Sequence, residues 1–192
     1  EAAARQAMAR YGAQRVALIL GTSTSGILSA EQAYRQRDAS GALPADFDYN
    51  TTHNTGALTA FVRDYLGIQG PAYTISTACS SSAKAFAAAD RLLQLQLADA
   101  VIVGGVDSLC LTTLYGFASL ELTSHQPCRP SDVARDGLSI GEAAAFALLT
   151  RDADGPHGPA SARLAGWGEA SDAHHMSAPH PEGRGSRTAM QA

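Results

Sequence analysis

Three stretches with few polar residues predict the strands of a buried sheet. Residues 16–20 and 99–106 are largely apolar, and residues 71–77 form a short apolar and β-branched run. Uninterrupted apolar runs of this length are typical of strands that are covered on both faces, and β-branched residues favour strands. We therefore expect a sheet that is sandwiched between layers of other elements.

Helical patterns alternate with these strands. Residues 1–12, 57–66 and about 81–97 are rich in Ala and Leu; Gly12 ends the first stretch and Gly67 follows the second. In the second stretch the apolar residues recur at helical spacing, at Leu58, Phe61, Val62 and Tyr65. An order of strand, helix, strand, helix, strand predicts parallel strands with right-handed crossovers and an α/β fold with helices on both faces of the sheet.

The second half of the chain gives weaker patterns. Residues 108–122 carry apolar side chains at roughly helical intervals, and we expect a strand from about Ala144 onward. A further strand-like stretch covers residues 162–168, and a histidine-rich loop covers residues 171–181. The two glycines of 21–26 have the spacing of a phosphate-binding loop, but Ile27 and Leu28 replace the lysine and hydroxyl residue that such a loop needs, so we predict a tight turn.

Cys79 lies at the junction between the strand predicted at 71–77 and the following helix. The first N–H groups of a helix lack intrahelical partners and the helix dipole is positive there, which lowers the pKa of a thiol and favours its nucleophilic thiolate form. A strand–turn–helix junction is also the geometry of a nucleophile elbow. Position alone leaves two interpretations open, because most isolated cysteines are small buried residues.

Composition narrows the classes of function. The formal net charge is −4, and a single lysine, Lys84, stands among 14 Lys and Arg residues that form no basic stripe, which argues against nucleic acid as a partner. Three cysteines without a C-x-x-C pair argue against a disulfide scaffold and a zinc site, so we expect no metal or cofactor and a cytoplasmic location.

No stretch is long enough to span a membrane. We expect one domain over residues 1–192, truncated at both ends, with no second complete domain.

The hexapeptide Thr77-Ala78-Cys79-Ser80-Ser81-Ser82 resembles the active-site motif of the β-ketoacyl synthases, which include acyl-carrier-protein synthases of fatty acid assembly and polyketide ketosynthases. Further stretches resemble family landmarks in the same order, from about Val16 to the end of the chain. These are Gln69–Tyr73, Asp99–Asp107, Cys128–Pro130, Arg135–Gly137 and Ser171–Met176.

The resemblance implies a thiolase-like fold, in which two similar α/β halves stack as alternating αβαβα layers, and this chain covers most of the N-terminal half. It implies that Cys79 accepts an acyl chain from acyl carrier protein, and that malonyl carrier protein then loses carbon dioxide and its carbanion attacks the thioester. The backbone N–H of Cys79 is expected to be one oxyanion-hole donor. A dimer is also implied, with the Cys79 loop near its interface.

The resemblance also sets limits on this chain. Family members handle the malonyl unit with two histidines and a lysine of the second half, which lie outside these residues, so the piece alone is expected to be inactive in condensation. We expect His174, His175 and His180 to be loop histidines and not general bases, and His53 to be a capping or interface residue. A structural charge cluster is expected beside the site at Arg129, Asp132, Arg135 and Asp136. Core packing is favoured over an acyl pocket for Leu109, Leu111, Leu114 and Phe117.

Three subtypes remain open. Residues 52–54, 81–86 and 106–110 favour a discrete bacterial carrier-protein synthase of a specialised lipid or polyene pathway. A ketosynthase domain of a polyketide synthase is the second possibility. The third is a non-catalytic partner subunit that sets chain length in a heterodimer, although such subunits usually lack the cysteine.

Overall fold

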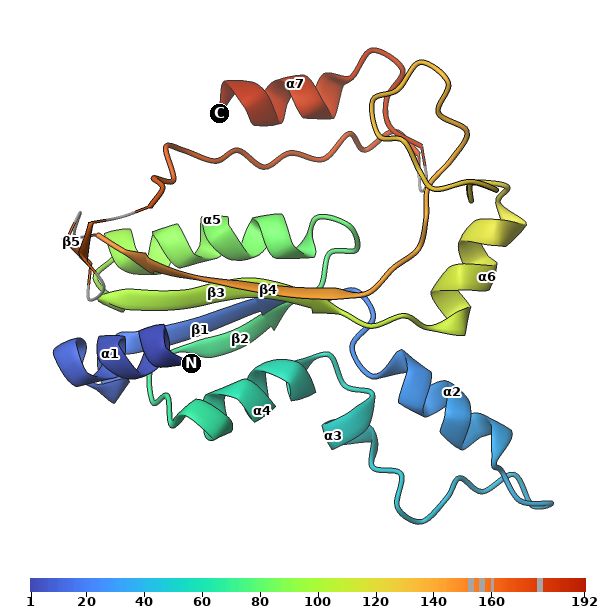
Figure 1. Cartoon of the computed structure of the whole chain (residues 1–192), viewed down its shortest axis with the longest axis horizontal. Helices are drawn as coiled ribbons and strands as arrows, with labels where there is room; N and C mark the ends of the chain where they lie inside the picture. Colours follow the sequence, from blue (N-terminus) through green and yellow to red (C-terminus); the bar gives the residue numbers. More distant parts are fainter. Residues whose placement is uncertain (152–153, 156–157, 160, 176–177) are drawn as a thin grey trace.

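A sheet of four strands forms the centre of the molecule (Figure 1). The computed structural model describes residues 1–151, 154–155, 158–159, 161–175 and 178–192. The strands lie side by side in the order β2 (Ala72–Ile75), β1 (Val16–Gly21), β3 (Ala100–Asp107) and β4 (Ala143–Thr150). The three strands expected from the apolar runs, and the one expected from about Ala144, are confirmed.

The strands β1, β2 and β3 are parallel, as the alternation with helices predicts. Every residue of β1 is buried, which agrees with its uninterrupted apolar sequence. The fourth strand, β4, pairs antiparallel with β3 over the whole length of both strands, from Ala100 with Thr150 to Asp107 with Ala143. The sheet is therefore mixed, with three adjacent parallel strands and an antiparallel strand at one edge.

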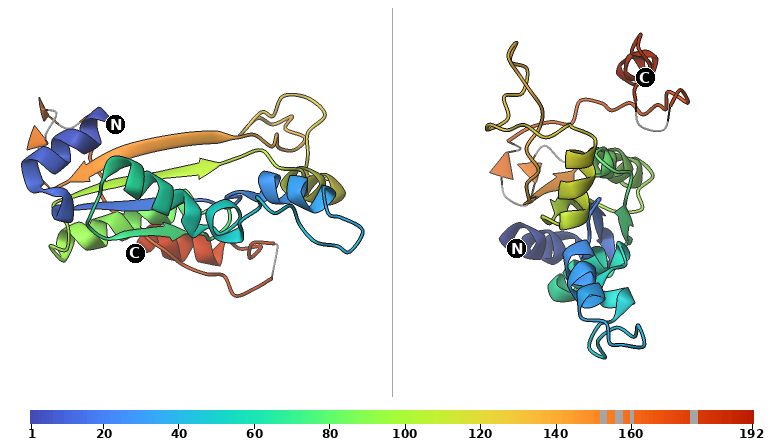
Figure 2. Two further views of the ribbon diagram at one scale, coloured as in Figure 1. Left: turned by 90° about the horizontal axis from the view of Figure 1, so that it is seen from below. Right: turned by 90° about the vertical axis from the view of Figure 1, so that its right-hand side faces the viewer.

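Helices cover both faces of the sheet (Figures 1 and 2). On one face lies α5 (Ser81–Gln94), whose alanines and leucines pack on Ile19, Val101 and Val103. On the other face α1 (Ala2–Tyr11), a short 3-10 turn (Ala13–Arg15) and α4 (Gly56–Leu66) border a second buried cluster around Leu18 and Leu20. The predicted layered α/β arrangement is confirmed.

Three further helices flank the end of the sheet where the parallel strands finish (Figure 1). They are α2 (Ile27–Arg35), α3 (Tyr49–Thr52) and α6 (Leu111–Ser119). The polar stretch 30–50 gave no signal for the first two. The expected helix at 108–122 exists in shortened form as α6, but none of its residues is buried, so the prediction that its apolar side chains pack in the core is wrong.

The strand expected at residues 162–168 does not form. Within the described residues no neighbouring strand is available to satisfy its backbone groups, and the segment instead runs along the outside of α5 (Figure 1). The chain then turns through the histidine-rich loop into α7 (Arg184–Gln191). A small hairpin of β5 (Asp154–Gly155) and β6 (Gly158–Pro159) precedes this segment. No helix in the described part of the chain is sufficiently long and apolar to cross a membrane.

Candidate active site at the start of α5

Cys79 lies in the turn that joins the end of β2 to the start of α5, and it is exposed. The carboxyl ends of parallel strands meet at one edge of a sheet, which is where open α/β sheets bind ligands. Here the turn after β1 and the segment after β3 reach the same edge as the Cys79 turn. Cys79 itself makes no hydrogen bond within the described residues, whereas Cys110 is buried and contacts the Thr113 hydroxyl at 3.0 Å.

The turn around Cys79 is held by the hydroxyl of Ser81, which is 2% exposed. This hydroxyl accepts a hydrogen bond from the N–H of Thr77 at 2.9 Å and donates to the carbonyl of Ala78 at 2.6 Å. Ala78 has a φ of 52°, in the left-handed region that residues other than glycine rarely adopt. Strained backbone of this kind persists where surrounding contacts enforce it and clusters at functional sites.

Two glycines let the start of α5 approach the sheet. Gly21, at the end of β1, and Gly105, near the end of β3, are direct neighbours in the sheet. A Cβ atom on Gly21 would lie 2.5 Å from the backbone of Ser81, and one on Gly105 would lie 1.9 Å from Oγ of Ser82. A side chain at Gly21 would have to displace the backbone at the Cys79 end of α5, whereas one at Gly105 would first meet the side chain of Ser82.

Asp107, at the end of β3, organises the neighbouring turn. One carboxylate oxygen accepts hydrogen bonds from the backbone N–H groups of Ser23 and Thr24 at 2.7 and 3.0 Å, and from the hydroxyls of Thr22, Ser23 and Thr24. Partial burial acts to raise the pKa of Asp107, but these donors outweigh it and hold the pKa below its ordinary value. The tight turn predicted at residues 21–26 is therefore fixed by a charged acceptor.

Replacing Asp107 with alanine is expected to lower the free energy of unfolding by about 1–3 kcal/mol near neutral pH, because hydrogen bonds to a charged acceptor are lost. A carboxylate whose pKa is lowered by folding stabilises the fold above its unfolded-state pKa of about 3.9, and this contribution disappears as the pH falls through the lower folded-state pKa. Urea unfolding should therefore show the difference from wild type shrinking below about pH 4. Alanine at the exposed Asp46 is the control, and a pH-independent difference at Asp107 would contradict the assignment.

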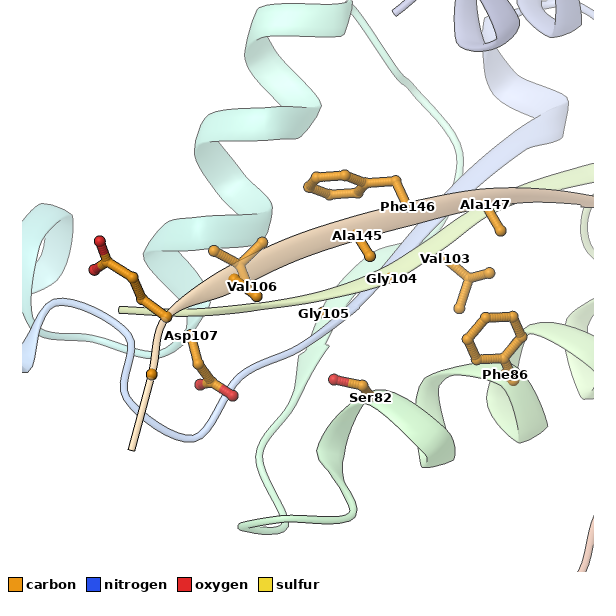
Figure 3. Close-up of a pocket in the computed structure, with 13 residues that line it drawn as sticks. Ser82, Phe86, Val103, Gly104, Gly105, Val106, Asp107, Ala145, Phe146 and Ala147 are labelled. Atoms are coloured by element: carbon orange, nitrogen blue, oxygen red, sulfur yellow. The ribbon is translucent and has the colours of Figure 1, made fainter. Parts of the chain in front are cut away.

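A cavity of about 570 Å³ lies next to Asp107, between α5 and the strands β3 and β4 (Figure 3). Ser82 and Phe86 project into it from α5, and Ala145 and Ala147 of β4 line the opposite side, whereas the Phe146 ring points away from Ser82 and Phe86. The residues considered for an acyl pocket, Leu109, Leu111, Leu114 and Phe117, do not line this cavity.

The histidine-rich loop is held by Asp172. Its carboxylate accepts the N–H groups of His180 at 2.9 Å and Gly185 at 2.5 Å, and these bonds lower the pKa of Asp172. The His174 and His180 rings lie 4.8 Å apart, and Nδ1 of His180 accepts the N–H of Glu182. His175 also accepts a backbone N–H through Nδ1. His175 and His180 are thus hydrogen-bonded loop histidines, and His174 lies against His180; Met176 lies outside the described residues.

His53 ends α3 through its backbone N–H, which donates to the carbonyl of Tyr49 at 2.9 Å. Its Nδ1 is buried and has no hydrogen-bond partner among the described residues. The side chain that caps the start of α4 belongs to the next residue, Asn54, whose carbonyl oxygen accepts from the N–H of Gly56. The side chain of His53 therefore does not cap α4, and its expected role at an interface stays a prediction.

The charge cluster expected at residues 129–136 does not form as ion pairs within the described residues. Arg129 instead donates to the carbonyl of Ala134, and Asp132 accepts the N–H of the same residue. Asp136 accepts from the hydroxyl of Ser124. These exposed side chains shape their own loop. No cluster of metal-ligating side chains occurs in the part of the chain that the structure describes.

Residues 2–155 match the model of the family described as "Beta-ketoacyl synthase, N-terminal domain". The chain belongs to the β-ketoacyl synthase family. It is 35% identical over 134 residues to 3-oxoacyl-[acyl-carrier-protein] synthase 2 of Rhizobium meliloti (strain 1021), across 65% of this chain and 32% of that protein. It is 30% identical over 188 residues to the synthase of the same name from Staphylococcus aureus, across 94% of this chain and 47% of that protein.

Solved structures of ketosynthases share the fold. A chain in the complex of the ketosynthase ApeO with its chain length factor ApeC from Xenorhabdus doucetiae matches with a TM-score of 0.83 and 43% identity, over 97% of this β-ketoacyl synthase chain and 46% of its own length. A β-ketoacyl synthase from Burkholderia phymatum STM815 matches with a TM-score of 0.79 and 24% identity, over 92% of this chain and 46% of its own. The fold is therefore the thiolase-like α/β fold, and the chain spans about half or less of the length of these relatives.

Proposed function

We propose that this chain carries the nucleophile of a β-ketoacyl synthase, and that Cys79 is the residue that becomes acylated. The observation that carries the proposal is the exposed thiol at a strained strand-to-helix turn in a chain of this family. In the proposed reaction, the Cys79 thiolate attacks the thioester carbonyl of an acyl chain on acyl carrier protein, and the thiol of the carrier leaves. The N–H of Cys79 stabilises the oxyanion that forms in this step.

The second proposed step is a decarboxylative Claisen condensation. Malonyl carrier protein loses carbon dioxide, the resulting carbanion attacks the acyl carbonyl on Cys79, and the Cys79 thiolate is released. The groups that handle the malonyl unit, two histidines and a lysine in the family, belong to the part of the protein beyond these residues. The 192-residue piece is therefore proposed to cover the N-terminal half only and to be inactive in condensation by itself.

Acylation of the full-length protein tests the proposal. Incubation with acyl carrier protein that bears an acyl thioester should add the acyl group to Cys79, as located by mass spectrometry of peptides. Iodoacetamide near neutral pH should modify Cys79 faster than Cys110 or Cys128, because Cys79 is the exposed one of the three thiols. The absence of an acyl adduct, together with an alkylation rate no higher than that of the other two thiols, would refute Cys79 as the nucleophile.

A heterodimeric ketosynthase is a second form of this function, and one solved neighbour supports it. The 43% identical neighbour belongs to a complex of a ketosynthase with a chain length factor, whereas the curated relatives named 3-oxoacyl-[acyl-carrier-protein] synthase 2 are 35% and 30% identical. A ketosynthase of polyketide assembly, paired with a related subunit, is therefore the second candidate, and a homodimer the alternative. The presence of Cys79 counts against the chain being the non-catalytic partner itself.

A further inference from the structure

The segment 161–170 is fastened to the outside of α5 by a set of polar contacts. One carboxylate oxygen of Glu169 accepts from Nζ of Lys84 at 2.6 Å, and the other pairs with Arg91. The Arg91 guanidinium also lies over the Trp167 ring, 4.1 Å from its centre, and the indole N–H donates to Asp90 at 2.8 Å. The segment thus runs antiparallel to α5, with Trp167 near the end of the helix and Glu169 nearer its start.

Glu169 bridges two turns of the helix. Lys84 and Arg91 are seven residues apart and so share one face of α5, about 10 Å apart along its axis. The side chains of Lys84 and Glu169 are 35% and 25% exposed, so this pair is shielded more than an ordinary surface ion pair. Glu169 is three residues from Asp172, which holds the histidine-rich loop and the start of α7.

Lys84 is the fourth residue of α5 and lies in its first turn. A positive charge there is unfavourable, because the start of a helix already carries the positive end of the dipole. Glu169 compensates that charge. The backbone N–H of Lys84 donates to the carbonyl of Ser80, the residue that follows Cys79, and the Ser80 hydroxyl donates to the carbonyl of Thr77. The pair therefore acts on the turn that carries the thiol.

We propose that Lys84 and Glu169 are positioning residues for Cys79 in the acyl transfer proposed above, on which this inference rests. From the sheet side, Gly21 and Gly105 set how closely the start of α5 lies on the strands. From the opposite side, the Lys84–Glu169 pair fastens the same turn of the helix to the segment 161–170. With both sides fixed, the Cys79 thiol is held where an acyl thioester reaches it, and catalysis depends steeply on such placement.

The test uses the full-length protein with Lys84→Met, Glu169→Gln, the double variant and Lys84→Arg. Acyl transfer from acyl carrier protein to Cys79 is measured by mass spectrometry, and iodoacetamide alkylation of Cys79 is followed from about pH 6 to about pH 10. Both single variants should slow acyl transfer by about 3- to 10-fold. The limiting rate of alkylation should change in the same direction in the two variants. The double variant should be no slower than either single variant. Lys84→Arg, which keeps the positive charge, should keep most of the wild-type rate of acyl transfer. Arg5→Ala, which removes an exposed ion pair with Glu1, is the control.

Other results would overturn the positioning role. If Lys84→Met and Glu169→Gln move the pH midpoint of alkylation in opposite directions and leave the limiting rate unchanged, the pair tunes charge and does not position the thiol. Unchanged rates in both variants would show that the contact is only structural, whatever the melting temperature does. If wild-type Cys79 is never acylated, the proposed function fails, and the alkylation profiles still decide the role of the pair.

Discussion

Replacing Cys79 with serine is expected to lower the condensing activity of the full-length protein by at least about 10³-fold. The substitution keeps the size of the side chain but removes the group that forms a thiolate, and losing a covalent nucleophile costs rate factors of this order or more. Because Cys79 is exposed and makes no hydrogen bond within the described residues, the free energy of unfolding should change by less than about 0.5 kcal/mol. Activity is measured as β-ketoacyl product from acyl and malonyl carrier proteins, and stability by urea unfolding.

Cys128→Ser is the matched control. Cys128 is half-buried in the loop that follows α6, where its N–H donates to the Ser139 hydroxyl, and it is expected to keep nearly full activity as serine. If Cys79→Ser retained more than a tenth of the wild-type rate, the covalent intermediate would have to form on another group. An equal loss in both variants would point to damage of the fold.

The central sheet could be predicted from sequence because its strands carry an intrinsic signal. β1 and the first five residues of β3 are buried on both faces, and only an uninterrupted apolar run satisfies such a position. The helices α1, α4 and α5 could be predicted because their sequences are rich in alanine or carry apolar residues at helical spacing. The order of these elements then leaves parallel pairing as the natural arrangement.

The later part of the chain was harder to predict because its structure depends on distant neighbours. Residues 162–168 have a strand-like composition, but a strand also requires a partner edge, and within the described residues Trp167 contacts α5 instead. α6 is apolar by composition and yet none of its residues is buried. Composition shows which segments are able to be buried, and the position of the other segments decides whether they are.

For the candidate site, the position of Cys79 was visible in the sequence, while its supports were not. A thiol between a strand and a helix is a local pattern. The hydrogen bond from Ser23 to Asp107 joins residues separated by 84 positions in the chain, and the ion pair of Lys84 with Glu169 joins residues separated by 85 positions. No local sequence pattern links residues that are so distant. The one available hint was that two of the expected strands run into glycines at the edge where the site lies.

Alanine at Gly21 is expected to disrupt both stability and the site. The new Cβ atom would lie 2.5 Å from the backbone of Ser81 and Ser82, which cannot rotate away as a side chain does. Overpacking of this kind costs about 1–3 kcal/mol of unfolding free energy. Because α5 must move to relieve the contact, acyl transfer to Cys79 should fall by about 10²-fold, as displacements near 1 Å do in other enzymes. Urea unfolding and the acylation rate of the full-length protein measure the two effects.

Two comparisons separate the close approach from a general effect of alanine. Gly116 in α6 faces open space, so Gly116→Ala should leave acylation unchanged. At Gly105 the nearest atom is the hydroxyl of Ser82, so Gly105→Ala should be milder than Gly21→Ala, and adding Ser82→Ala should recover part of the loss. Equal acylation rates for Gly21→Ala and Gly116→Ala would show that the contact between β1 and the start of α5 does not govern where the thiol lies.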